Sequence, residues 1–188
     1  MNIFLALLIG GLFGFALDRV RASNPNYIIT MLKLENLYLM KAILFAIGFA
    51  STLMFAGQML GLVEVGHMSV KASYFGVVLG GIILGIGWAI SGYCPGTGIA
   101  AAASGRVDAM IFILGGLLGA FVYMLVFDQL MDSTVMNSLF GGKVTLGTIP
   151  GSKFEGIFTI RGDILGIVLG CVFMFIAYKL PEKILKRR

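Results

Sequence analysis

Charged residues are scarce in this chain of 188 residues, where they make up 12% of the total. A soluble domain carries about 25%. Hydrophobic residues make up 59%, and the mean hydropathy is +0.98. A membrane core about 30 Å thick requires about 20 apolar residues in a helix, and several stretches reach or approach that length. The composition excludes a water-soluble domain and predicts an all-α polytopic membrane protein, with residues 1–188 forming a single integral membrane domain.

Histidine and cysteine are nearly absent. The chain has one histidine, His67, and two cysteines, Cys94 and Cys171, which lie far apart in or beside apolar segments. Without a CxxC or HxxxH pair, neither a metal site nor a secreted disulfide framework is expected. The sequence also shows no nucleophile–base–acid set and no phosphate-binding loop, so we expect no enzyme activity and no cofactor.

A net charge of +5 would suit a nucleic-acid partner, but the basic residues stand at the ends of apolar segments and form no patch. We therefore exclude nucleic acid as a partner. In a membrane protein, an excess of lysine and arginine marks the cytoplasmic face, so these residues predict the orientation of the chain. With five spans, one face collects ten of the 14 basic residues and the other has Lys71, Lys143, Lys153 and Arg161. This predicts an external N-terminus and a cytoplasmic C-terminus.

Five apolar segments predict about five transmembrane helices. The first, Asn2–Leu17, lacks the basic start and cleavage pattern of a signal peptide, so we expect a retained helix. Between the first two spans, Tyr27–Leu39 is either an interfacial helix or a short re-entrant piece. The long connection Asp128–Gly162 is expected to be an ordered surface loop with a short β-like piece at its Val-Thr-Leu run. The other four predicted spans are Met40–Val63, Tyr74–Ile90, Val107–Phe127 and Ile164–Leu180.

A weak internal repeat appears when the chain is shifted by about 70 residues. The shift places Gly10-Gly11 on Gly80-Gly81 and Pro25 on Pro95. The predicted repeat units are 1–63 and 74–127, with the helix 164–180 outside them. Each unit is a helix, a proline-bearing break and a second helix. Transporters often carry such repeats and bind their substrate where the repeats meet.

The most unusual stretch is Ser91–Gly98, which brings a cysteine, a proline and three glycines together between apolar segments. Pro95 is expected to end the incoming helix. The alanine-rich run that follows then forms a new short helix, for which we predict Thr97 as the N-cap. Irregular backbone at membrane depth survives only where it is buried in protein or lines a wet cavity. This broken helix therefore indicates a substrate path.

The thiol of Cys94 is predicted to lie near the free N–H groups and the positive end of a helix dipole, a setting that favours an anion. A thiol suits a sulfur-bearing anion better than a hard oxyanion. The plainer alternative is that Cys94 is a small packed residue. Glycines let the backbone approach a ligand closely. The predicted substrate-binding residues are therefore Cys94, Pro95, Gly96, Thr97, Gly98 and Gly92.

Three further residues are secondary candidates. Asn24 occupies the position equivalent to Cys94 in the repeat, and is either a simple turn residue or part of the path. Arg106 and Asp108 begin the fourth span and are expected to form an interfacial ion pair, although Arg106 could also attract an anion. Cys171 lies within the fifth span, where packing is the simpler explanation and a second relay thiol the alternative.

The run Gly92-Tyr93-Cys94-Pro95-Gly96-Thr97, followed by Gly105-Arg106-Val107-Asp108-Ala109, resembles the YeeE/YedE family of sulfur-compound permeases. So do Phe13–Arg19 and Ser23–Asn26. The resemblance extends to about Phe127 and implies thiosulfate uptake across the bacterial inner membrane, with cysteine thiols contacting the anion. Only Cys94 matches a motif cysteine of that family.

Full-length members have about twice this length, so the resemblance implies a half-length member. Such a chain would pair with itself or with a second half-length subunit. The charge bias favours one orientation, which disfavours an antiparallel homodimer. An alternative function is a non-transporting membrane subunit that docks a cytoplasmic sulfur-carrier or sulfurtransferase protein, and a channel for an unrelated solute is also compatible with the glycine-rich bundle.

Overall fold

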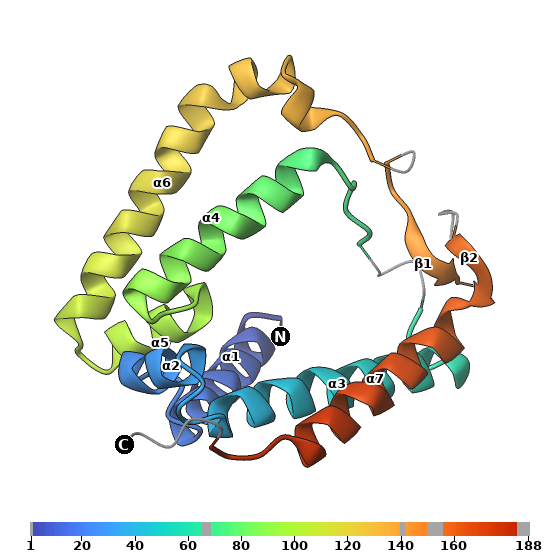
Figure 1. Ribbon diagram of the computed structural model, residues 1–188, viewed down its shortest axis with the longest axis horizontal. Coiled ribbons are helices and arrows are strands. Elements are labelled where there is room, and N and C mark those ends of the chain that lie inside the picture. Colours follow the sequence, from blue (N-terminus) through green and yellow to red (C-terminus); the bar gives the residue numbers. More distant parts are fainter. Residues whose placement is uncertain (1, 65–68, 140–141, 150–155, 184–188) are drawn as a thin grey trace. The chain divides into compact units, whose positions relative to one another are not determined.

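The structure is a computed structural model, and it describes residues 2–64, 69–139, 142–149 and 156–183. His67, Lys153 and the basic tail Lys186, Arg187 and Arg188 lie outside the described residues. The chain is mostly helical, which confirms the predicted fold class (Figure 1). The helices are α1 (Asn2–Arg19), α2 (Pro25–Leu32), α3 (Tyr38–Met59), α4 (Phe75–Ser91), α5 (Pro95–Ala103), α6 (Val107–Met131) and α7 (Gly162–Lys179), with a 3₁₀ turn at Thr134–Met136.

Four stretches in the described part of the chain are long and apolar enough to cross a membrane: Tyr38–Met59, Phe75–Ala103, Val107–Met131 and Gly162–Lys179. They match four of the five predicted spans. The first predicted span forms the 18-residue helix α1, which is not among the four. A crossing by α1 therefore stays a prediction.

These helices are apolar on all sides. In α6, none of the most apolar window is buried inside the protein, and residues such as Leu117, Phe121 and Met124 are exposed. A helix that is hydrophobic all round belongs in a protein core or in a membrane. Because the fold leaves this surface uncovered, lipid is the environment that suits it.

The chain divides into two compact units. The first unit comprises 1–39, 81–129 and 181–188. It holds α1, α2, α5 and most of α4 and α6. Its core contains Tyr93, Ala101 and Ala109, with Phe112 packed against them. The small side chains of α5 and the start of α6 allow this close packing, and the Tyr93 ring lies 5.7 Å from that of Phe112.

The second unit comprises 40–80 and 130–180. Here α3 and α7 approach closely at glycines: a Cβ atom built on Gly170 would lie 2.7 Å from the carbonyl oxygen of Gly48. The Ser51 hydroxyl also donates to the carbonyl oxygen of Gly166 at 3.1 Å. Small residues are typical of helix pairs in membranes, where packing rather than water exclusion drives association.

The long connection after α6 contains two strands, β1 (Thr145–Thr148) and β2 (Gly156–Arg161). They pair in parallel, with Thr145 opposite Gly156 and Gly147 opposite Phe158. The expected β-like piece is therefore present as β1. The partner strand β2 was not predicted, although its Ile-Phe-Thr-Ile run has the β-branched and aromatic residues that strands favour.

Candidate functional site

The predicted break between α4 and α5 is present. Helix α4 ends at Ser91, Gly92 adopts φ +69°, and α5 begins at Pro95. Glycine suits this position because a side chain disfavours left-handed backbone. Proline suits the first helical position because it has no N–H group to leave unsatisfied. The incoming helix thus ends and the new one starts within four residues.

The prediction that Thr97 caps α5 is wrong: the N-cap is Cys94. The Thr97 N–H donates to Cys94 Sγ at 3.4 Å, and the Cys94 N–H donates to Thr97 Oγ1 at 3.0 Å. This reciprocal pair is a capping box. Because the helix already starts at Pro95, the residue before the proline becomes the cap and Thr97 becomes the third helical residue. The thiol is therefore held at the positive end of α5.

The other predicted site residues differ in exposure. Thr97 and Gly98 are buried, Cys94 is half-buried, and Pro95 and Gly96 are exposed. A Cβ atom on Gly98 would lie 2.6 Å from the ring of Phe112, so this glycine packs against α6. Gly96 has open space around it. Of the three glycines near the thiol, Gly96 is the one whose surroundings leave room for a ligand.

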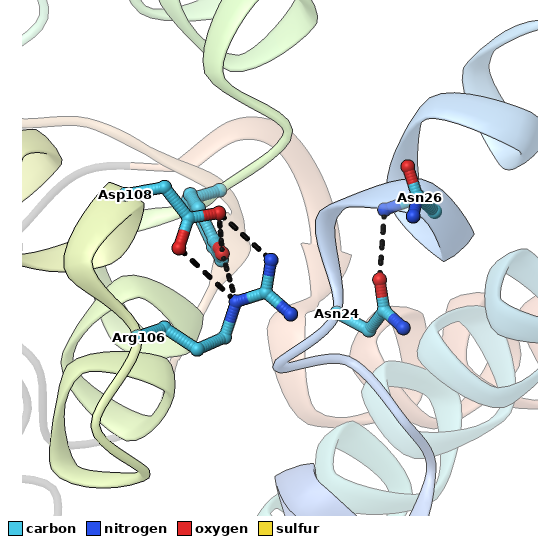
Figure 2. Close-up of polar contacts among 5 residues, drawn as sticks. Asn24, Asn26, Arg106 and Asp108 are labelled. Carbon is cyan, nitrogen blue, oxygen red and sulfur yellow. Dashed lines mark hydrogen bonds and ion pairs between the residues drawn. The ribbon is translucent and has the colours of Figure 1, made fainter.

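Asn24 has the same local role as Cys94. It is the N-cap of α2, and its side chain accepts from the Asn26 N–H at 3.1 Å (Figure 2). Pro25 follows as the first helical residue, as Pro95 does in α5. The starts of α2 and α5 are separated by the length of one predicted repeat, although the repeat itself stays a prediction.

The two breaks are in contact. A Cβ atom on Gly92 would lie 2.8 Å from Pro25 Cβ and 3.1 Å from its carbonyl oxygen. Helices α1 and α5 also pack together. The two proline-bearing breaks therefore meet inside the first unit, as expected if they contribute to one site.

Next to the α2 cap lies a polar cavity of about 390 Å³, lined by Asp18, Arg19, Arg21, Ser23 and Asn24. Ser23 is buried and donates to Asp18 at 2.6 Å. Arg21 donates to the hydroxyl of Tyr27 and lies over its ring. The sequence predicted only a shared orienting role for the basic residues of this face, and the closeness of Arg19 and Arg21 to the Asn24-Pro25 turn was the available clue to the cavity.

Arg106 and Asp108 form the predicted ion pair, with Arg106 Nη2 at 2.8 Å from Asp108 Oδ2 (Figure 2). The structure adds Tyr93 to this pair. Its hydroxyl donates to Asp108 Oδ2 at 2.9 Å and accepts from Arg106 Nε at 2.9 Å. The hydrogen bond to Asp108 is the main cause that raises the pKa of Arg106, so the guanidinium stays charged. Tyr93, the residue before Cys94, is thus hydrogen-bonded to both charged residues at the start of α6.

Cys171 is an exposed, free cysteine on α7. It belongs to the second unit, whereas Cys94 belongs to the first. Its neighbourhood offers no helix start or break, because it lies in the middle of α7. We therefore find no local feature that would make it a second relay thiol.

Several membrane-length helices and a broken helix that carries a capped thiol define a multi-pass membrane protein. Residues 21–187 match the sulphur transport family, and the chain belongs to that family. This confirms the resemblance to a family of sulfur-compound permeases and marks the protein as a membrane transporter.

Two curated proteins from Xylella fastidiosa are similar to this chain, and both are named probable transporters. One is from strain Temecula1 and the other from strain 9a5c. Each is 30% identical over 126 residues, which is 63% of this chain and 85% or 86% of the relative. No solved structure matches the chain.

Proposed function

We propose that this protein is a permease subunit for thiosulfate or a related sulfur-containing anion, and that the anion passes the Cys94 thiol. The observation that carries the proposal is the position of Cys94 as the N-cap of α5, in a chain of the sulphur transport family. The start of a helix carries the positive end of its dipole, which stabilises an anion. Pro95 has no N–H group and the Thr97 N–H donates to Cys94 Sγ, so the dipole and the thiol, rather than a row of free N–H groups, would hold the anion at the start of α5.

The thiol gives this site a preference among anions. Cys94 Sγ already accepts a weak hydrogen bond from Thr97 and lies 3.2 Å from its hydroxyl. When the anion passes, the Cys94 S–H group leaves these contacts and donates a weak hydrogen bond to the terminal sulfur of the anion. Weak contacts of this kind suit transport, because binding must also permit release. Gly96 leaves the backbone open on the same side of the helix start.

We further propose that the chain lies in the bacterial inner membrane with its N-terminus outside and its C-terminus in the cytoplasm. This requires α1 to be the fifth crossing. The pathway would be completed by a second half-length subunit, either a parallel copy of this chain or a sister protein. The uneven distribution of basic residues supports one fixed orientation.

The test is labelled thiosulfate uptake in cells that lack their own uptake route, at matched membrane expression. Wild type is expected to take up thiosulfate, whereas Cys94→Ala and Cys94→Ser lose uptake. Cys171→Ala is the matched control and is expected to retain it. Uptake that persists in both Cys94 variants would contradict the mechanism. If wild type shows no uptake, co-expression with a sister subunit tests whether a partner chain is required.

A further inference from the structure

We infer that Arg106 is a second anion-binding residue, which holds the oxyanion end of the substrate, and that Tyr93 and Asp108 position it. The identity of the anion rests on the proposed function, but the binding site does not. Two different side chains would then bind the two ends of the substrate: the Cys94 thiol contacts its terminal sulfur, and the Arg106 guanidinium binds its oxygen atoms.

Hydrogen bonds along one edge of the Arg106 guanidinium, the edge that carries Nε and Nη2, fix the orientation of this group. Nε donates to the Tyr93 hydroxyl at 2.9 Å and to Asp108 Oδ1 at 3.2 Å, and Nη2 donates to Asp108 Oδ2 at 2.8 Å. Tyr93 is 2% exposed and anchored in the core of the first unit. Three hydrogen bonds to two partners therefore hold the planar group in one direction.

The opposite edge is free to bind. Within the described part of the chain, Nη1 has no hydrogen-bond partner, and the Arg106 side chain is 39% exposed. Figure 2 shows the guanidinium extending from the start of α6 toward the turn that carries Asn24. The parallel N–H groups of arginine match two oxygen atoms of an oxyanion. This edge is thus a preformed fork for two oxygen atoms, on the side of the Asn24 turn in Figure 2.

The local charge favours an anion of moderate affinity. Arg19 and Arg21 line the polar cavity at the same turn, and Asp18 shares its lining. The Arg106–Asp108 pair is neutral as a unit, so Arg19, Arg21 and Asp18 leave a net charge of +1 among these five residues. Asp108 offsets part of the attraction of Arg106, which suits an affinity that also permits release.

The chain contains a matched control for this arrangement. Arg161 and Asp163 stand at the start of α7 with the same spacing, and their ion pair is 3.1 Å long. In the part of the chain that the structure describes, the Arg161 side chain donates to Asp163, and no tyrosine takes part in the pair. An effect that arises merely from an arginine paired with an aspartate at a helix start would appear at both places.

The experiment measures the affinity of the purified full chain for thiosulfate and for sulfate by calorimetry, in nanodiscs of neutral phosphatidylcholine. Arg106→Gln is expected to weaken the binding of both anions about tenfold or more, because it removes hydrogen bonds from a charged donor. Arg106→Lys keeps the charge without the fork and should weaken binding less. Tyr93→Phe should weaken it about threefold, since the guanidinium loses one of its two anchors.

Arg161→Gln should leave both affinities unchanged, even if it lowers the melting temperature. This control distinguishes a loss of anion affinity from a loss of stability. If Arg106→Gln fails to fold, Arg106→Lys still tests the role of the guanidinium. Wild-type affinity in Arg106→Gln, or no anion binding by the wild type, would overturn the inference. So would anion binding that disappears when phosphatidylglycerol replaces phosphatidylcholine, because the edge would then be a lipid-headgroup site.

The two proposals can fail separately. Cys94→Ala is expected to weaken thiosulfate binding while leaving sulfate binding intact, because sulfate has no terminal sulfur. If Cys94→Ala affects neither binding nor uptake while Arg106→Gln weakens both anions, the thiol mechanism fails and the Arg106 site stands. The reverse result would remove Arg106 from the path and leave Cys94 in it.

Discussion

Replacing Gly92 by alanine tests whether the two breaks really depend on close contact. Gly92 adopts φ +69°, and an added Cβ atom would lie 2.8 Å from Pro25 Cβ and 3.1 Å from the Pro25 carbonyl oxygen. Left-handed backbone costs a residue with a side chain about 1–2 kcal/mol. Overpacking in a tight contact adds about 1–3 kcal/mol. Because Pro25 is rigid and part of the contact is backbone, the free energy of unfolding should fall by about 2–5 kcal/mol.

Gly96→Ala is the matched control, four residues away in the same break. Gly96 has no neighbouring atom within 4 Å of an added Cβ and no positive φ. Alanine there should be neutral or slightly stabilising. The measurement is thermal unfolding of both purified variants. At about 2–4 °C per kcal/mol for a chain of this size, Gly92→Ala should melt at least about 4 °C lower. Equal melting temperatures would refute the contact between the breaks.

The remaining predictions concern the α5 cap and the α3–α7 contact. Thr97→Val removes the oxygen that accepts from the Cys94 N–H and should cost about 1 kcal/mol of stability, as lost caps do; Thr97→Ser should cost less. Equal stability of the two variants by thermal unfolding would speak against the capping box. Gly170→Ala would place a Cβ atom 2.7 Å from the Gly48 carbonyl oxygen and should destabilise by about 1–3 kcal/mol. Gly115→Ala, with open space around it, should be neutral, and a similar loss in both would argue against tight α3–α7 packing.

The helical architecture was accessible from sequence because long apolar segments and prolines act locally. The end of α4 and the start of α5 follow from Gly92 and Pro95. The same reasoning left Tyr27–Leu39 between an interfacial helix and a re-entrant piece, and the structure gives α2 at Pro25–Leu32 with a capped start. Proline position, rather than hydropathy, was the better guide to that boundary.

The details of the site depend on contacts between distant residues, which no local pattern specifies. Thr97 was chosen as the cap because threonine is a preferred cap residue, yet Pro95 had already fixed the helix start one step after Cys94. Nothing in the local sequence singled out Tyr93, whose hydroxyl meets Arg106 and Asp108 because the start of α6 packs against α5. The ion pair itself was predictable, since its members are two residues apart.

The sulfur N-cap has a further meaning when the two breaks are compared. Asn24 caps α2 with an oxygen atom, which is among the best choices for that position, whereas Cys94 caps α5 with sulfur, a weak acceptor. Helix α5 thus gives up local stability that serine or asparagine would supply. Residues that break a local rule concentrate where function requires them. Cysteine at this cap is a compromise in which a firmer helix start is given up for a weak hydrogen-bond partner that a substrate can displace.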